Sequence, residues 1–211
     1  MPLEMRVAGL ALKKGYNLLV SNLDLVVKPG QAVSLMGGNG VGKTTLLRTI
    51  AGFSAPHAGT IAFSEGDAAV ETEAVQASRI HLLGHHDALS PSRTVRQELR
   101  FQADFLGGDV GAAAALELDN LMDLETRYLS AGQKRRLSCA RLMMAPRPLW
   151  LLDEPMAPLD AGHRNLLAFL MQQHLKDGGS LIAAVHDPLP FATETLRLER
   201  PTLAQVEAAG G

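Results

Sequence analysis

The sequence predicts an α/β domain built around a mostly parallel sheet. Short apolar runs that indicate strands alternate with segments of helical spacing, which is typical of a parallel sheet with crossover helices. A glycine-rich loop joins one such strand, at 31–36, to a helix at 45–51, and an apolar run at 149–152 ends in two acidic residues. Ligands of open α/β sheets bind at the carboxyl ends of the strands, so we expect both features at one edge of the sheet.

Length and composition limit the class of protein. The 211 residues allow one domain, 1–211, with a subdomain. Lysine and arginine number 20 against 22 acidic residues, which argues against a nucleic-acid binder driven by bulk charge. The single cysteine, Cys139, excludes an internal disulfide framework. No apolar run reaches the roughly 20 residues of a membrane span, and no signal peptide is visible, so the expected compartment is the cytoplasm.

The first part of the chain combines short strands with the start of the parallel core. Weak alternation at 3–12 indicates a strand that could lie at a sheet edge, and 18–27 indicates its partner in a hairpin. A further short strand is expected at 60–63, after a turn that contains Pro56 and Gly59. We therefore expect an N-terminal antiparallel β subdomain next to the parallel core.

The glycine-rich loop fits the phosphate-loop pattern of glycine, four residues and Gly-Lys-Thr. Glycines let backbone N–H groups approach an anion closely, Lys43 places a positive charge against the outer phosphates, and Thr44 offers a hydroxyl to hydrated magnesium. The alternative, a glycine-rich turn with a chance lysine, is disfavoured because a strand precedes the loop and a helix follows it. The expected nucleotide-binding residues are Gly37, Gly38, Asn39, Gly40, Val41, Gly42, Lys43, Thr44 and Thr45.

The second half of the chain supplies the other strands and a helical insert. A buried strand is expected at 79–83, and helical spacing dominates about 88–147. An apolar strand at 149–152, a helix at 161–176 and a strand at 180–185 complete the sheet. We expect 88–147 to form a helical subdomain inserted between elements of the parallel sheet.

Two acids follow the strand at 149–152. Asp153 is expected to hold magnesium, through water, as the acidic partner of the phosphate loop. Glu154 comes one residue later, points the other way, and can polarise the water that attacks the terminal phosphate. The alternative is a pair of solvated acids at a strand end, which the phosphate loop upstream disfavours.

A third pattern is Leu-Ser-Ala-Gly-Gln at 129–133, followed by Lys-Arg-Arg at 134–136 on an expected helix. Ser130 can cap this helix, and with Gly132 it would leave N–H groups at the positive end of the helix dipole as a second anion seat. The alternative is an ordinary capped helix with a solvated basic face.

Taken together and in this order, these motifs resemble the ATP-binding subunits of ABC transporters. Leu159-Asp160 is similar to the D-loop of that family, and His186, after the strand at 180–185, to its switch histidine. The resemblance implies an α/β P-loop NTPase of ABC type, with a mostly parallel core, an N-terminal antiparallel β subdomain and a helical subdomain that carries the signature motif. It also implies an ATPase that uses ATP and Mg²⁺.

The resemblance assigns roles to individual residues. Two such domains would pair head to tail, so that the phosphate loop of one faces Ser130, Gly132 and Gln133 of the other across ATP. Glu154 would be the catalytic base, and His186 would contact the terminal phosphate and hold Glu154 and the water in place. Asp160 would lie at the dimer interface.

Two departures from the common pattern narrow the resemblance. The family usually has a glutamine that contacts magnesium after the strand at 79–83, where this chain has Gly84-His85-His86. His85 is a candidate magnesium ligand because it stands near that position. Tyr16 is a candidate for stacking on adenine, with Lys14 as the competing residue. Together with Leu-Ser-Ala-Gly-Gln-Lys-Arg-Arg, the histidine resembles the heme-exporter ATP-binding subunits of bacterial cytochrome c maturation.

This narrower resemblance implies partners and a location. The expected partners are a second copy of the chain and integral membrane subunits of the cytochrome c system, with no nucleic acid. The expected place is the cytoplasmic side of the inner membrane, as a peripheral subunit. Direct heme binding is not expected, because the nucleotide site and a strand account for His81, His85 and His86.

Three alternatives remain at this point. The chain could be the ATPase subunit of another small ABC exporter, or a soluble ABC-type ATPase that acts in DNA repair or translation. It could also be a regulatory nucleotide-binding module without turnover, which the presence of Lys43, Asp153, Glu154 and His186 disfavours.

Overall fold

The computed structural model describes residues 2–203, 205 and 206. The small residues Ala-Ala-Gly-Gly at 208–211 predict a frayed tail, and this segment lies outside the described residues. Within the described residues, five parallel strands form the central sheet in the order β6-β7-β8-β3-β9. These strands are β3 (Ala32–Met36), β6 (Ile80–Leu83), β7 (Leu149–Asp153), β8 (Ser180–Ala184) and β9 (Glu194–Arg197). The phosphate-loop strand β3 thus lies beside β8, and β8 lies beside the strand that ends in the two acids.

A second, antiparallel sheet is built from the N-terminal part of the chain. Its strands are β1 (Glu4–Lys14), β2 (Asn17–Val27), β4 (Ala58–Glu65) and β5 (Ala68–Val70), in the order β2-β1-β4-β5. The hairpin of the first two strands confirms the prediction. The expectation that 3–12 lies at an edge is wrong, because β1 pairs with β2 on one side and with β4 on the other.

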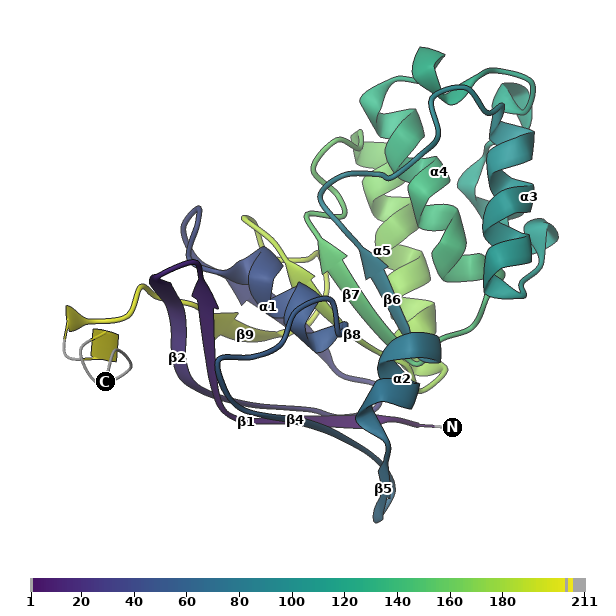
Figure 1. The fold of residues 1–211 in the computed structure, drawn as a ribbon. Helices are drawn as coiled ribbons and strands as arrows, with labels where there is room; N and C mark the ends of the chain where they lie inside the picture. The colour runs from purple at the N-terminus through teal and green to yellow at the C-terminus, as the bar shows by residue number, and fades with distance from the viewer. Residues whose placement is uncertain (1, 204, 207–211) are drawn as a thin grey trace.

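The helices surround the parallel sheet. The α-helices are α1 (Lys43–Ile50), α2 (Thr72–Ser78), α3 (Val95–Leu106), α4 (Ala131–Met144) and α5 (Ala161–Lys176). Three short 3-10 segments, η1 (Val110–Leu116), η2 (Asp119–Leu121) and η3 (Thr126–Tyr128), lie between α3 and α4. Figure 1 shows α3 and α4 gathered at one end of the molecule, away from the antiparallel strands. None of the helices in the described part is long and apolar enough to cross a bilayer.

The core has two halves, one on each face of the parallel sheet. Side chains of a strand alternate between the two faces, and in β7 Trp150 and Leu152 pack into one half while Leu149 and Leu151 pack into the other. The first half lies against α3, α4 and α5, and the second contains α1 and the inner face of the antiparallel sheet. Both faces of β7 are therefore buried, which explains its continuous apolar run.

Several elements differ from the sequence predictions. The alanine-rich composition of Gly111 to Leu118 predicts a helix there, but the structure has the 3-10 segment η1 at Val110–Leu116 rather than an α-helix. It is short because Glu117 has a left-handed backbone (φ 53°) and ends it. The elements β5, α2 and β9 were not predicted. The helix at 161–176 matches α5 residue for residue.

Candidate functional site

The glycine loop leads from β3 into α1 at the carboxyl edge of the parallel sheet. Gly42, the residue before α1, has a φ of 112°, and a Cβ there would lie 3.2 Å from the Cβ of Leu19. Glycine is therefore required both by the backbone angle and by the approach of β2. No side chain caps the start of α1, so the first backbone N–H groups of this helix donate to no capping side chain. This end of α1 can accept an anion.

Lys43 begins α1 and is almost fully buried. Its Nζ donates hydrogen bonds to the carbonyl oxygens of Gly37 (2.7 Å) and Gly38 (3.2 Å). These bonds hold the ammonium group inside the curve of the loop, close to the exposed N–H end of the helix. At Gly37, with φ 144°, a Cβ would lie 2.5 Å from the carbonyl oxygen of Leu198. The segment after β9 therefore packs directly against the backbone of the loop, and only glycine fits there.

Thr44, in the first turn of α1, and Asp153, at the end of β7, are in contact although β8 lies between β3 and β7. The Thr44 hydroxyl donates to Oδ2 of Asp153 over 2.7 Å, although the residues are 109 positions apart. Asp153 is the last residue of β7 and is buried. Magnesium prefers oxygen ligands and is held in nucleotide sites by few protein oxygens together with phosphates and water, and this pair fits that description. Elsewhere among the described residues no group of three or more His, Cys, Asp or Glu side chains could hold a metal.

Glu154 follows Asp153 with a left-handed backbone (φ 49°), which is uncommon for a residue other than glycine. The two neighbouring carboxylates have different partners, since Asp153 accepts from Thr44 and Glu154 faces two histidines. One carboxylate oxygen, Oε1, lies 2.9 Å from Nε2 of His186. The other, Oε2, lies 3.8 Å from Nδ1 of His85. Each oxygen of the carboxylate thus faces a histidine, and the Glu154 side chain is 24% exposed.

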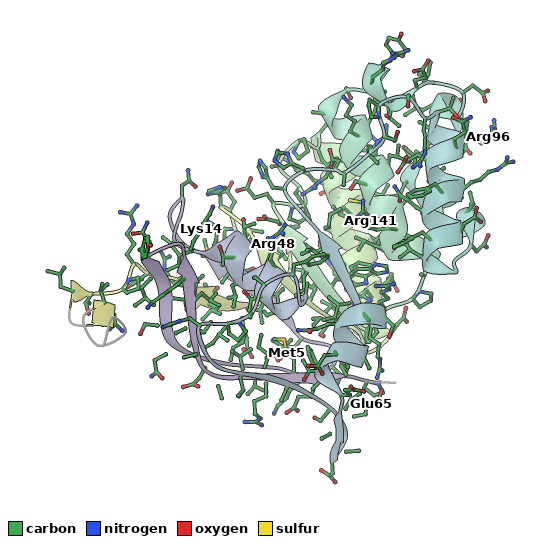
Figure 2. The ribbon with its side chains drawn as sticks, viewed as in Figure 1. Met5, Lys14, Arg48, Glu65, Arg96 and Arg141 are labelled. Carbon is green, nitrogen blue, oxygen red and sulfur yellow. The ribbon has the colours of Figure 1, made fainter. Side chains whose placement is uncertain are left out.

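A cavity of about 400 Å³ joins the phosphate loop, the two acids and His85, whereas His186 reaches Glu154 from outside the lining of this cavity. The structure brings together in its wall most of the predicted phosphate-loop residues, Asp153, Glu154 and His85, and adds Lys14 and Leu19 from the hairpin; the lining residues are Lys14, Leu19, Gly38, Asn39, Gly40, Gly42, Lys43, Thr44, Thr45, His85, His86, Asp153 and Glu154. Lys14, the last residue of β1, is labelled in Figure 2. Tyr16 lies in the turn after it with a fully exposed ring, and its role toward adenine stays a prediction.

The signature stretch starts α4 with a complete capping box. The Ser130 hydroxyl accepts from the backbone N–H of Gln133 (3.2 Å), and Oε1 of Gln133 accepts from the N–H of Ser130 (2.8 Å). This confirms that Ser130 caps the helix. The N–H groups of Ala131 and Gly132 have no acceptor within the helix and remain for an anion. A Cβ on Gly132 would lie 2.9 Å from the carbonyl oxygen of Pro158, so this glycine is needed where α4 meets the segment before α5.

Asp160 caps α5. Its Oδ1 accepts from the backbone N–H of His163 (2.9 Å), and both carboxylate oxygens lie 2.8 Å from the His163 ring nitrogen Nδ1. The backbone N–H of His163, and then its ring, lower the pKa of the Asp160 carboxyl. Ser130, Gly132, Gln133 and Asp160 do not line the cavity that contains Lys43. Within one chain, the two predicted anion seats are therefore separate.

Sequence reasoning missed Arg135. The Lys-Arg-Arg run allowed a solvated basic face as an alternative, and for Arg135 that alternative is wrong, because its side chain is only 1% exposed. Its guanidinium bonds the backbone of the segment that carries Glu154. The sequence of a helix alone does not separate an exposed arginine from one that is enclosed by loops, because most arginines are exposed and the enclosing loops come from elsewhere in the chain.

A phosphate loop between a strand and a helix, a carboxylate beside its threonine and a second carboxylate held by a histidine define a nucleotide-hydrolysing P-loop domain. The family model described as ABC transporter matches residues 20–157, and the chain belongs to this family of ATP-binding, ATP-hydrolysing proteins.

Curated relatives give a more particular likeness. The chain is 44% identical over 202 residues to the cytochrome c biogenesis ATP-binding export protein CcmA of Rhodopseudomonas palustris strain HaA2, covering 92% of this chain and 98% of the relative. It is 44% identical to the protein of the same name from Nitrobacter winogradskyi, covering 92% and 98%, and 41% identical to that of Brucella abortus, covering 89% and 87%.

Solved structures agree with the fold. A putative ABC transporter ATP-binding protein from Pyrococcus furiosus superposes with a TM-score of 0.79 at 22% identity, over 92% of this chain and 97% of that one. A dimeric bacterial ABC transporter cassette superposes with a TM-score of 0.78 at 20% identity, over 92% and 94%. At these identities the likeness concerns the fold alone.

Proposed function

We propose that this chain is the ATP-hydrolysing subunit of a membrane transport complex that serves cytochrome c maturation, in the step that exports heme or releases the heme-loaded chaperone. The names of relatives at 41–44% identity support the cytochrome c assignment. We propose that residues 1–211 act as one ATP-binding domain, in which about 88–147 is the helical subdomain with the signature motif. The integral membrane subunits of the same system would be its partners, and its place would be peripheral, on the cytoplasmic side of the inner membrane.

ATP would bind with its phosphates in the glycine loop. The N–H groups of the loop and of the start of α1 would hold the phosphate oxygens, and Lys43 would turn its ammonium group from Gly37 and Gly38 toward them. Thr44 and Asp153 would hold Mg²⁺, directly or through water, and His85 remains a candidate ligand. When bound, the ion would neutralise charge on the phosphate oxygens. Tyr16 or Lys14 would contact the base.

Glu154 would orient and deprotonate the attacking water. A base must lie within hydrogen-bond reach of its proton, and Glu154 lines the same cavity as Lys43 and Thr44. His186 would hold the carboxylate through Oε1 and contact the terminal phosphate from the other ring nitrogen. The adjacent ends of β7 and β8 support this pairing, because the N–H of Glu154 also donates to the carbonyl oxygen of Ala184 (2.9 Å).

A second copy would complete the site. The signature residues Ser130, Gly132 and Gln133 form an anion seat on the same chain but outside its own cavity, so a head-to-tail pair is the arrangement that uses both seats. Asp160, fixed by His163, would lie at the interface between the two chains. Neither nucleic acid nor heme is proposed to bind this chain: His81 is buried and bonded to the carbonyl oxygen of Ala145, and His85 faces Glu154.

The observation that carries the proposal is the Glu154 carboxylate in the wall of the phosphate-loop cavity, held by a histidine at 2.9 Å. The test is complementation between two inactive chains, Lys43→Ala and Ser130→Arg. Ser130 is exposed, and loss of its cap costs only about 1 kcal/mol, so the second variant keeps its fold.

In a head-to-tail pair, a mixed dimer has one intact site, made of the loop of one chain and the signature end of the other. Mixing equal amounts should therefore restore up to about a quarter of wild-type ATPase activity, since half of the dimers are mixed and each has one of two sites. No recovery in the mixture, with exchange of subunits verified by labelled chains, would contradict the shared site. Wild-type protein without ATPase activity would contradict the proposal as a whole.

A further inference from the structure

The most completely bonded buried charge in the described part of the chain is the guanidinium of Arg135 on α4. A guanidinium has five N–H donors, and here Nε, Nη1 and Nη2 together reach the carbonyl oxygens of Gly84, Asp153, Glu154 and Pro155 and the Oδ1 of Asp87. The side chain is 1% exposed. Each donor thus has an acceptor, as a buried arginine requires.

Three of these acceptors are consecutive carbonyl oxygens. Nη2 donates to Asp153 and to Glu154 (2.9 Å), and Nε donates to Pro155 (3.2 Å). Three successive carbonyl groups converge on one planar group only where the chain turns sharply, and the left-handed backbone of Glu154 provides this turn. The unusual conformation costs of order 1 kcal/mol and persists because the surroundings impose it. The guanidinium of Arg135 thus binds the backbone of the whole turn at 153–155.

The remaining acceptors belong to the loop after β6. Nη1 donates to the carbonyl oxygen of Gly84 (2.8 Å) and to Oδ1 of Asp87 (3.1 Å), on either side of His85. Two more residues on the same face of α4 hold this loop, because the Ser138 hydroxyl (3.0 Å) and Nη2 of Arg141 (3.2 Å) both donate to the carbonyl oxygen of Asp87. Arg141 is labelled on α4 in Figure 2.

We propose that Arg135 is a positioning residue for hydrolysis, which fixes Glu154 and the His85 loop relative to the signature end of its own chain. The inference rests on the proposed function. Arg135 shares α4 with Ser130, so a ligand bound at the start of the helix and the carboxylate of Glu154 are joined through one rigid element. Engagement of Ser130 by the partner's nucleotide would therefore be transmitted to this chain's own Glu154.

The neighbouring arginine provides a matched control. Arg136 uses Nη1 to bond the carbonyl oxygens of Leu116 and Glu117 (both 2.9 Å), at the end of η1 in the helical part of the chain. Arg136 carries the same charge and lies on the same helix as Arg135, but its hydrogen bonds go to the end of η1 and not to the segment of Glu154. Arg135→Gln and Arg136→Gln thus remove the same charge from α4, but only Arg135→Gln removes hydrogen bonds to the segment of Glu154.

The experiment measures binding and turnover separately in the full-length protein. Binding is measured with the fluorescent analogue TNP-ATP, and turnover is expressed per mole of bound analogue, so that unfolded protein is not counted. For Arg135→Gln we expect kcat to fall by about 100-fold, as for a misplaced catalytic group, with the Kd for TNP-ATP and the KM within about threefold of wild type. For Arg136→Gln we expect kcat within about threefold of wild type.

A second comparison separates positioning from a general structural effect. In a Glu154→Gln background, Arg135→Gln should reduce the residual turnover by less than about threefold, because the group that it positions is already absent. If Arg135→Gln does not fold, Arg135→Lys takes its place: one ammonium group cannot reach both loops, and the same loss of kcat is expected.

Equal kcat in wild type and the folded Arg135 variant would overturn the proposal. An equal loss of kcat in Arg136→Gln would also overturn it. So would a reduction of turnover by Arg135→Gln that is as large in the Glu154→Gln background as in wild type. These outcomes leave the proposed function standing, since it depends on wild-type turnover and on complementation between Lys43→Ala and Ser130→Arg chains.

Discussion

Nε2 of His186 lies 2.9 Å from Oε1 of Glu154, and the two residues follow neighbouring strands whose backbones are paired. Glu154 follows β7 and His186 follows β8, which are neighbouring parallel strands in register from Leu149 opposite Ser180 to Asp153 opposite Ala184. The ladder continues one step further, because the N–H of Glu154 donates to the carbonyl oxygen of Ala184. The sheet itself therefore holds the proposed base against its histidine.

The first prediction concerns Glu154→Gln. The amide keeps the shape of the side chain and an acceptor for His186, but it cannot take a proton from water. We expect ATP to bind with an affinity within about threefold of wild type, while kcat falls by at least about 100-fold, the scale of general base catalysis. The closed dimer should accumulate with ATP, which gel filtration detects.

The control for this variant is Asp67→Asn, an exposed acid in the turn between β4 and β5. It removes the same charge without touching the cavity, and its turnover should equal that of wild type. Unchanged hydrolysis in Glu154→Gln would remove the assignment of this residue as the base.

The second prediction concerns Lys43→Ala. The substitution removes the buried ammonium group that bonds the carbonyl oxygens of Gly37 and Gly38, and with it the positive charge for the outer phosphates. We expect nucleotide binding or turnover to be lost, by a factor of about 100 or more in kcat/KM. Lys28→Ala, at an exposed turn residue, is the control and should behave as wild type. An active Lys43→Ala protein would exclude the phosphate-loop interpretation.

The nucleotide edge of the sheet could be predicted from sequence because its signals are local. The glycine loop, the apolar run of β7 and the two acids after it are each read within a few residues, and the parallel sheet places them together. Asp153 and Thr44, 109 positions apart, are in hydrogen-bond contact for this reason. The switch histidine could be placed only through its order behind the other motifs.

Other features of the fold and site could not be predicted, because they depend on contacts between segments that are far apart in the sequence. Arg135 is buried because two loops, at 84–87 and 153–155, fold around it, and no pattern in α4 shows which arginine they choose. The strand β9 is mostly exposed and polar, and it is a strand only because it pairs with β3 at the edge of the sheet. The central position of β1 likewise follows from its pairing with β4, whose residues come 47 to 60 positions later in the chain.

The third prediction concerns His85→Gln. The His85 side chain is 63% exposed, and its Nδ1 lies 3.8 Å from Glu154, beyond hydrogen-bond distance. Glutamine offers an oxygen ligand and an amide donor at the same place, so we expect ATPase activity within an order of magnitude of wild type across a magnesium titration. A complete loss of activity would show that the histidine itself binds the metal or the carboxylate. His57→Gln, at an exposed position, is the control.

The last prediction concerns the stability of the fold toward acid, and it depends on His81 in β6. Its side chain is buried, and its Nε2 bonds the carbonyl oxygen of Ala145 over 2.7 Å. Burial lowers the pKa of His81 from 6.5 to about 4, against the smaller raising effect of the backbone hydrogen bond. The folded protein therefore keeps this ring neutral between pH 6.5 and 4, while the unfolded chain binds a proton there.

Because the unfolded state binds more protons in this window, the free energy of unfolding falls as the pH drops below 6.5. From pH 7 to pH 5 the contribution of His81 amounts to a loss of about 2 kcal/mol. Urea unfolding at the two pH values measures it in wild type and in His81→Gln, in which the amide can still donate to Ala145. We expect the pH-dependent loss to be smaller by about 2 kcal/mol in the variant, whatever its stability at pH 7. His57→Gln should keep the full wild-type loss, and an equal loss in His81→Gln would show that this histidine is protonated in the folded protein.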